Sequence, residues 1–463
     1  MRIRFGTSGW RGIIAREFTW DRVDLILDAI AVHLLEEGRD SVVVGGDTRF
    51  LSPELAASAA RRLSGAGFRV LLADRPTPTP VLSHACRTLR AGGVVNFTAS
   101  HNPPLYNGIK FSPWHGGPAD GAVTSRLEEL IDSGAVPRAS AGSVETRDLV
   151  SAYVRDILGF LDPAVFGESG LRVVYDAFSG TGSGILDRVL VDLGASVRVL
   201  NASRDPLFAG REHPEPGAEG TADLSREVRR SGASLGVATD GDADRFGIVD
   251  ENGDFLSPHD FLPLLLDYLA GRRGMRGLVV RSVTTGSLLD RVATAHGLDV
   301  EVTPVGFKHL GARMLATDVL LAGEESGGLS IRGHVPEKDG ILACLLASEM
   351  VCAGGRGLAA QLGELHARYG RSYISRRDVP LDEPLRARIV GRYFDSVPSE
   401  IGGLRVERVD RMDGVRLLLE GGSWVLIRLS GTEPLARVYA EAPTPELREH
   451  VLDSALAAAL AES

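Results

Sequence analysis

The chain has 463 residues, of which 44% are hydrophobic and 24% are charged, and this composition is typical of a soluble globular protein. A chain of this length exceeds one compact core, so we expect about three or four domains. Its formal net charge of −10 at pH 7 argues against nucleic acid or an anionic membrane as a main partner.

The first residues, Met1 to Gly6, lack the apolar run of a signal peptide. The longest apolar stretch, near residues 261–266, is interrupted by Pro263, so we expect no segment that crosses a bilayer. The three cysteines are odd in number and show no metal-ligand spacing. The sequence therefore predicts a soluble cytoplasmic protein with reduced thiols.

A weak repeat occurs three times along the chain. Each copy reads as an apolar strand, a helix, a glycine (Gly67, Gly194 or Gly297) and a second strand that contains a valine three positions after the glycine. Apolar strands that alternate with helices indicate buried, mostly parallel sheets, and a glycine is the expected residue just after a helix. The predicted first strands are 41–44, 171–175 and 278–281, the helices 53–64, 185–193 and 288–295, and the second strands 68–72, 197–200 and 300–303.

The last part of the chain has a different pattern. Residues 405–409, 415–419 and 424–427 read as antiparallel strands, and residues 445–461 as an alanine-rich helix. We therefore predict three similar α/β domains with mixed, mostly parallel sheets, followed by a smaller α+β domain. The predicted domains are 1–148, 149–252, 253–369 and 370–463.

The first motif with chemical potential is Thr98-Ala99-Ser100-His101-Asn102-Pro103. The prolines prevent a continuing helix, so Ser100 is expected on a loop with its hydroxyl exposed. A serine in such a turn commonly bonds to the local backbone, but a hydroxyl in this position can also carry a phosphoryl group. Lys110 follows ten residues later, either as a loop lysine on the surface or as a group that transfers protons.

The second motif is a triplet of carboxylates, Asp240, Asp242 and Asp244, directly after the apolar strand 235–238. Three carboxylates at alternate positions repel one another unless a cation or protonation relieves them. A divalent metal is the simplest explanation, and Mg²⁺ fits better than zinc because no cysteine or histidine accompanies the set. Arg245 follows at once and can hold two oxygens of a phosphate with its planar fork.

Two later loops complete the set. In Gly323-Glu324-Glu325-Ser326-Gly327, the paired acceptors Glu324 and Ser326 suit adjacent sugar hydroxyls. In Arg428-Leu429-Ser430-Gly431-Thr432-Glu433-Pro434, backbone amides, hydroxyls and one arginine offer a phosphate cradle, to which Arg437 can add a second charge.

The four motifs together resemble the α-D-phosphohexomutase family, in the family's order and over nearly the whole chain. The family has three similar α/β domains and a smaller fourth around a central cleft. The resemblance implies a phosphorylated Ser100 that also contributes a metal ligand beside the three aspartates, with His101 adjusting protonation, Lys110 transferring protons and Arg245 facing the same phosphate.

The resemblance also implies residues for the substrate. Ser8 and Arg11 match an N-terminal loop that lines the cleft, Lys308 and Lys338 match positions on the sugar side, and Glu324 and Ser326 match residues that bind two sugar hydroxyls. The phosphate that does not react is assigned to Arg428, Ser430, Gly431 and Thr432, with Arg437.

We therefore interpret the sequence as a Mg²⁺-dependent phosphohexomutase that interconverts hexose 1-phosphate and hexose 6-phosphate through a bound hexose 1,6-bisphosphate. The sugar loop, with Glu325 and Gly328, is nearer to the GEESGG of glucose-type members than to GEMSGH. The alternatives are a phosphoglucosamine mutase, a metal-dependent sugar phosphatase, and a non-catalytic sugar-phosphate sensor. The sequence leaves open the preference between glucose and mannose and whether Lys110 acts as acid, base or both.

Overall fold

A computed structural model of the chain describes residues 3–6, 9–167, 169–430 and 434–460. The chain forms two compact units, of which unit 1 comprises residues 1–261 and 306–361, and unit 2 comprises residues 262–305 and 362–463.

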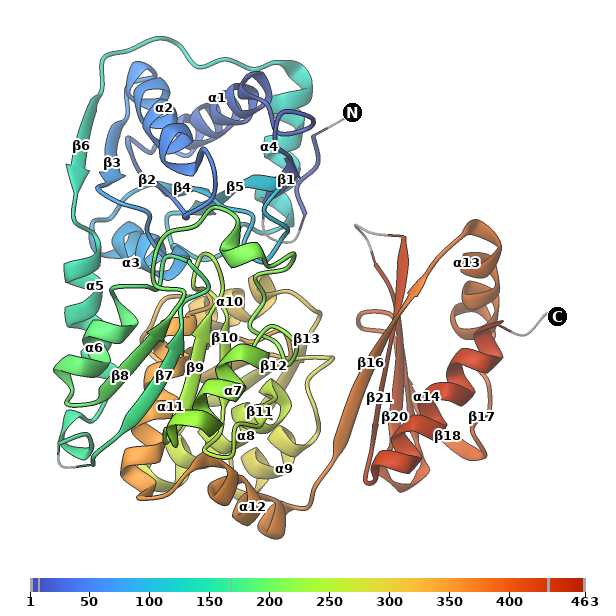
Figure 1. Cartoon of the computed structure of the whole chain (residues 1–463). Coiled ribbons are helices and arrows are strands. Elements are labelled where there is room, and N and C mark those ends of the chain that lie inside the picture. The colour runs from blue at the N-terminus through green and yellow to red at the C-terminus, as the bar shows by residue number, and fades with distance from the viewer. Residues whose placement is uncertain (1–2, 7–8, 168, 431–433, 461–463) are drawn as a thin grey trace. The chain divides into compact units, whose positions relative to one another are not determined.

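Unit 1 begins with a six-stranded sheet in the order β1-β5-β4-β2-β3-β6. Strands β4, β2, β3 and β6 are parallel, while β5 and β1 extend the sheet in antiparallel fashion. Figure 1 shows α1, α2 and α4 on one face of this sheet and α3 on the other. The strands are β1 (Trp10–Ile13), β2 (Ser41–Gly46), β3 (Arg69–Ala73), β4 (Gly93–Phe97), β5 (Tyr106–Pro113) and β6 (Ser143–Arg147), and the helices are α1 (Trp20–Glu36), α2 (Ser52–Gly65), α3 (Thr79–Thr88) and α4 (Gly121–Ser133).

A second sheet in unit 1 has the order β11-β10-β9-β7-β8. Strand β7 is parallel to both of its neighbours, and β10 and β11 add antiparallel strands. The turn between β9 and β10 therefore lies at the carboxyl end of a parallel strand, where α/β sheets commonly bind ligands. The elements are β7 (Arg172–Asp176), β8 (Ser196–Leu200), β9 (Leu235–Thr239), β10 (Phe246–Val249), β11 (Phe255–Leu256), α5 (Val150–Ile157), α6 (Leu186–Asp192) and α7 (Ala222–Ser231).

The third α/β region contributes to both units. In unit 1, β14 (Val319–Glu324) and β15 (Gly328–Ile331) form a hairpin with α10 (Phe307–Ala316) and the almost wholly buried α11 (Gly340–Gly354). In unit 2, β12 (Leu278–Ser282) and β13 (Val300–Thr303) are parallel and are connected by α9 (Leu288–Ala295). Helices α8 (Pro258–Asp267) and α12 (Leu358–Tyr369) lie at the points where the chain passes from one unit to the other.

The carboxyl-terminal domain is an antiparallel sheet in the order β16-β21-β20-β19-β18-β17. Its own hydrophobic core joins one sheet face to α13 and α14. The sequence predicted three of these strands and the last helix. It did not predict β16, which pairs with β21 and forms one long edge of the sheet. The elements are β16 (Tyr373–Pro380), β17 (Glu400–Ile401), β18 (Leu404–Asp410), β19 (Val415–Leu419), β20 (Trp424–Leu429), β21 (Leu435–Ala442), α13 (Glu383–Ile389) and α14 (Pro445–Leu460).

The predicted fold class, three α/β domains with mixed sheets and a smaller α+β domain, is confirmed. The three repeat glycines follow their helices as the repeat predicted, and each has a positive φ, 98° at Gly67, 99° at Gly194 and 67° at Gly297. Among the described residues, no single helix is long and apolar enough to cross a bilayer. The bent pair of α11 and α12 passes the same test together, judged by length and composition alone.

Candidate active site

Ser100 lies on the loop between β4 and β5, but its side chain is not exposed as the sequence suggested. The residue is only 2% exposed, and its Oγ donates a hydrogen bond to Asp240 Oδ2 at 2.9 Å. The backbone of Ser100 has a φ of 51°, in the left-handed region, and its amide is held by Thr98 Oγ1. A Cβ on Gly241 would come within 3.3 Å of the Ser100 carbonyl oxygen, so the serine loop packs closely on the aspartate loop and is covered by it.

Arg49, which the sequence analysis missed, holds this loop by hydrogen bonds to its backbone. Its fully buried guanidinium donates hydrogen bonds to the carbonyl oxygens of Ser100 at 2.5 Å, Asn102 at 2.6 Å, Pro103 at 2.9 Å and Tyr106 at 3.0 Å. Carbonyl oxygens that converge on one cation leave the loop little freedom to change shape. The loop geometry is therefore set by an arginine that stands about fifty residues earlier in the chain.

Asp240, Asp242 and Asp244 converge in the turn between β9 and β10, as the sequence predicted. All three are buried, and one oxygen of each lies within 4.8 Å of the others. Lys110, which lies on strand β5 rather than on a loop, places its Nζ 2.7 Å from Asp242 Oδ2 and 3.0 Å from Asp244 Oδ2. Because β5 pairs with β4, its backbone gives the amine a rigid base.

The charges in this cluster shift one another's pKa. Burial and the charges of Asp242 and Asp244 raise the pKa of Asp240 well above its usual range. Burial also disfavours the charged form of Asp244, but the lysines Lys110 and Lys338 outweigh it and lower the pKa of that carboxyl. The pKa of Lys110 is raised, because its attraction to the two aspartates exceeds the cost of burial.

The triplet fits a divalent cation by its donor set. Oδ1 of Asp242 and Oδ1 of Asp244 are buried and have no hydrogen-bond partner among the described residues. A buried carboxylate oxygen without a donor is costly, and hard oxygen ligands of this kind suit Mg²⁺. The three aspartates could therefore hold a metal ion beside the Ser100 hydroxyl.

Two arginines and a histidine contact the serine and aspartate loops. The Arg245 amide donates to Asp240 Oδ1 at 3.1 Å, and its guanidinium lies 2.5 Å from Glu215 Oε1. Arg11 donates a hydrogen bond to the Asn102 side chain, and burial together with the Arg245 charge lowers the pKa of Arg11 to about 10. Nδ1 of His101 lies 3.3 Å from Ser100 Oγ.

His101 is neutral in this setting. Burial and the positive charges of Arg245 and Arg11 lower the pKa of His101 well below its usual range. A neutral imidazole can accept a proton or a hydrogen bond at one ring nitrogen, whereas the charged form can only donate.

The predicted sugar loop is the turn of the β14–β15 hairpin. Glu324, which is 4% exposed, accepts a hydrogen bond from the Gly306 amide at 2.8 Å. Burial and the neighbouring Glu325 charge raise the pKa of Glu324 to about 7. The carbonyl oxygen of Gly327 accepts a hydrogen bond from the amide of Phe246, which follows the aspartate loop and Arg245 in the chain. The turn that carries half-buried Ser326 is therefore held next to that loop.

Lys338 joins this turn to the carboxylates. Its Nζ lies 3.1 Å from Asp244 Oδ2, and a Cβ on Gly328 would come within 2.3 Å of its Cδ. It also lies over the Phe307 ring at 5.7 Å. Phe307 is followed by half-buried Lys308 in the first turn of α10. Lys338 thus contacts the aspartate triplet as well as the predicted sugar loop, which the family resemblance did not suggest.

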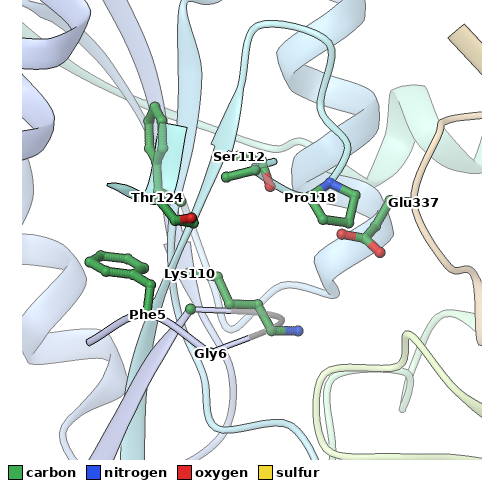
Figure 2. A pocket seen from close by; sticks show the side chains of 10 residues that line it. Phe5, Gly6, Lys110, Ser112, Pro118, Thr124 and Glu337 are labelled. Carbon is green, nitrogen blue, oxygen red and sulfur yellow. The ribbon is translucent and has the colours of Figure 1, made fainter. Parts of the chain in front are cut away.

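A small pocket lies beside Lys110. Lys110 and Glu337 both line it, together with Ser112, Pro118 and Thr124 (Figure 2). Its space of about 20 Å³ is close to that of one water molecule and far below what a phosphosugar needs. This pocket is therefore not the substrate site, although a water there could reach the amine and the carboxylate.

The predicted phosphate loop lies in unit 2, after β20. Arg428 and Arg437 are direct partners in the β20–β21 ladder, and the Ser430 amide donates to the carbonyl oxygen of Leu435 at 2.9 Å. Arg428 Nε lies 2.9 Å from Asp413 Oδ1. The predicted residues Ser8, Gly431 and Thr432 lie outside the described residues.

Residues that the sequence analysis missed differ in the signal they offered. Arg49 follows β2 directly, at the carboxyl end of a parallel strand, so its position was a clue. Thr79, whose Oγ1 donates to Asp242 Oδ2 at 2.6 Å, offered no such clue, because its partner lies far along the chain.

The amino-acid composition also points to the site. Only three of the 51 basic residues are lysines, and all three are predicted site residues, Lys110, Lys308 and Lys338.

Comparison with known families covers most of the chain. Residues 2–137, 151–253 and 257–369 match the alpha/beta/alpha domains I, II and III of phosphoglucomutase/phosphomannomutase, and residues 394–458 match the C-terminal domain of the same family.

Curated relatives are similar over nearly their full length. A phosphoglucomutase/phosphomannomutase from Thermococcus kodakarensis is 33% identical over 97% of this chain and 96% of its own. A phosphopentomutase from the same organism is also 33% identical with the same coverage, and a probable phosphoglucosamine mutase from Pyrococcus horikoshii is 32% identical with the same coverage.

Solved structures agree with these sequence matches. The putative phosphomannomutase from Thermus thermophilus is 38% identical, covers 98% of each chain and superposes with a TM-score of 0.86. An N-acetylphosphoglucosamine mutase from Aspergillus fumigatus, in complex with GlcNAc-6P and magnesium, shares the fold at 17% identity and a TM-score of 0.58, over 99% of this chain and 95% of its own.

Proposed function

Because the chain belongs to the phosphoglucomutase/phosphomannomutase family, we propose that it is a phosphohexomutase with phosphorylated Ser100 as its phosphoryl carrier. The observation that supports this most directly is the Ser100 hydroxyl, buried against Asp240 in a cluster of three carboxylates and two lysines. Few arrangements other than phosphoryl transfer need a hydroxyl among so many charges.

The reaction moves one phosphoryl group in each half. The free hydroxyl of the sugar attacks the phosphorus on Ser100, the bond to Ser100 Oγ breaks, and a hexose 1,6-bisphosphate forms. The bisphosphate then reorients, and Ser100 Oγ attacks the other phosphorus to regenerate the phosphoserine and release the isomer. Each half needs a group that removes a proton from the attacking oxygen and one that protonates the leaving oxygen.

The described residues divide this work by position. Lys110 extends from strand β5, and its amine lies nearest to the carboxylates, so we assign proton transfer to it. Neutral His101, beside Ser100, is a second group that can transfer protons. Arg245 and Arg11 hold the reacting phosphoryl group, while Glu324, Ser326, Lys308 and Lys338 bind the sugar. By resemblance to the family, Arg428 and Arg437, with Ser430, Gly431 and Thr432, are assigned to the phosphate that does not react, and Ser8 to the N-terminal loop that lines the cleft.

Asp240, Asp242 and Asp244, with an oxygen of phosphorylated Ser100, would hold Mg²⁺. The bound ion would neutralise negative charge on the phosphoryl oxygens. The buried, donor-free oxygens of Asp242 and Asp244 support this assignment.

The substrate proposed is glucose and/or mannose phosphate, with a phosphoglucosamine mutase as the alternative. Relatives named for hexose, glucosamine and pentose phosphates have nearly equal identity to this chain, so identity does not separate them. A side-by-side turnover assay with glucose, mannose, glucosamine and ribose 1-phosphates separates these substrates.

The reaction class is tested with hexose 1-phosphate, with and without added hexose 1,6-bisphosphate. We expect the 6-phosphate as product and activation by the bisphosphate. Stoichiometric release of inorganic phosphate would instead indicate a phosphatase, and binding without turnover would indicate a sensor.

A further inference from the structure

Two arginines lie directly opposite each other in unit 2. Arg428 of β20 is the register partner of Arg437 of β21, so both side chains share one face of the sheet. Like charges in this arrangement repel each other. Each arginine has a carboxylate at its Nε: Asp413 Oδ1 lies 2.9 Å from that of Arg428, and Asp378 Oδ2 lies 3.9 Å from that of Arg437. Only the first of these contacts is a hydrogen bond.

The hairpin turn between β18 and β19 places Asp413 beside Arg428. Gly414 has a φ of 96°, and a Cβ at this position would come within 2.4 Å of the Ile427 carbonyl oxygen. The turn therefore lies against β20 at the residue before Arg428. A side chain at position 414 would lift the turn and withdraw the carboxylate.

Both carboxylate oxygens of Asp413 accept hydrogen bonds. Oδ2 accepts a hydrogen bond from the Val305 amide at 2.9 Å, while Oδ1 accepts from Arg428 Nε. The backbone amide fixes the carboxylate, and the carboxylate in turn fixes the plane of the guanidinium. An arginine held at Nε presents its two terminal nitrogens as a planar fork, which matches two oxygens of a phosphate.

We propose that Asp413 is a positioning residue that sets the guanidinium plane of Arg428 for the phosphate of the sugar that does not react. The proposal rests on the proposed function, because that function assigns Arg428 to this phosphate. Asp413 itself acts only through Arg428. Its benefit is a guanidinium that is oriented before the substrate binds.

Charge alone predicts the opposite effect, and this difference makes the proposal testable. A carboxylate beside a phosphate site repels the phosphate, so removal of its charge would strengthen binding if charge were all that mattered. If Asp413 orients Arg428, removal of the Asp413 charge weakens phosphate binding, because the guanidinium of Arg428 is no longer held in a fixed plane. The sign of the change in affinity separates the two explanations.

The first experiment compares Asp413→Asn with a matched control, Asp410→Asn. Asp410 is the last residue of β18, directly before the same turn, and its Oδ1 accepts from the Met412 amide at 2.9 Å. The control therefore removes the same charge without the Arg428 contact. We expect Asp413→Asn to raise KM for hexose 1-phosphate about tenfold, which corresponds to one charge-assisted hydrogen bond, with a much smaller change in kcat. Asp410→Asn should keep the KM of the parent enzyme.

The second experiment combines Asp413→Asn with Arg428→Ala. If Asp413 acts through Arg428, the double variant should have the KM of Arg428→Ala alone. The dissociation constant for the same phosphosugar, measured by calorimetry in the Ser100→Ala background where no turnover is expected, follows the same comparison. If Asp413→Asn unfolds at a lower temperature than Asp410→Asn, the smaller neutral variant Asp413→Ser is measured in its place.

The outcomes separate this proposal from the function on which it rests. An unchanged or lower KM in Asp413→Asn, while Arg428→Ala weakens binding, overturns the role of Asp413 alone. Additive effects in the double variant overturn it as well, because they show a contribution that does not pass through Arg428. If Arg428→Ala itself leaves binding unchanged, the assignment of Arg428 to the phosphate is wrong.

Discussion

At the scale of single residues, the site depends on lysines where the rest of the chain uses arginine. Lys110 and Lys338 each place one compact charge on Asp244, at 3.0 and 3.1 Å. An ammonium group is a more compact charge than a guanidinium, so two of them can approach one carboxylate closely. The restriction of lysine to positions 110, 308 and 338 is therefore consistent with a need for compact charges.

Asp242 offers a test of the metal assignment. We expect Asp242→Asn to lower kcat by several orders of magnitude and to weaken the dependence of activity on Mg²⁺, because one of the three proposed carboxylate ligands becomes a neutral amide. Thermal unfolding should show a folded protein. Full activity in the variant, together with a parent enzyme that is insensitive to EDTA, would refute a metal at this triplet.

Glu324 predicts a pH dependence of stability. Its pKa of about 7 in the folded protein exceeds the ordinary value of 4.5, so the folded state binds more protons between these two values. The free energy of unfolding should therefore fall as pH rises through this window, by up to about 3 kcal/mol from this group. Denaturant unfolding of the parent protein and of Glu324→Gln measures the difference, which should appear between pH 4.5 and 7 and level off above it. Parallel pH curves for the two proteins would contradict the shift.

At the scale of elements, the serine loop is held by an arginine from a different βα turn. Arg49→Lys keeps the charge, but an ammonium group has three donors for four carbonyl oxygens, so at least one charge-assisted hydrogen bond of about 1.5–3 kcal/mol is lost. We expect kcat to fall at least about tenfold while KM for the phosphosugar changes little, because the sugar and phosphate loops are other segments of the chain. Steady-state kinetics measures this split. A rise in KM with kcat preserved would show that the loop does not depend on this clamp.

The elements themselves were largely predictable, because their signals are local. The three repeat units and their glycines follow from residues that are adjacent in the chain, and the strand before the Asp240 turn follows from four apolar residues. The burial of Ser100 was not predictable, because it depends on the packing of Gly241 and on the hydrogen bonds from Arg49. The contact between Asp413 and Arg428 likewise depends on a strand register that no local pattern fixes. The domain boundaries near 148, 252 and 369 remain predictions.

At the scale of the whole molecule, the proposed mutase binds the reacting phosphate and the phosphate that does not react with different loops. Arg428→Ala should mainly raise KM, by roughly tenfold to more than a hundredfold, because a charge-assisted contact of about 1.5–3 kcal/mol is lost. Some fall in kcat is expected, since remote binding energy helps to orient the reacting hydroxyl. Phosphorylation of Ser100, read from the intact mass, should survive. Loss of the phosphoserine with KM unchanged would place Arg428 at the reacting phosphate instead.

The central claim is that the phosphoryl group on Ser100 leaves with the sugar while the sugar's own phosphate returns to the enzyme. It is tested most directly by loading Ser100 with isotopically labelled phosphate and following one turnover with unlabelled hexose 1-phosphate. We predict that the label appears in the hexose 6-phosphate or the bisphosphate, that the protein keeps an unlabelled phosphate, and that Ser100→Ala neither takes up label nor turns over. Label released as inorganic phosphate, or label retained on the protein while product forms, would contradict the account.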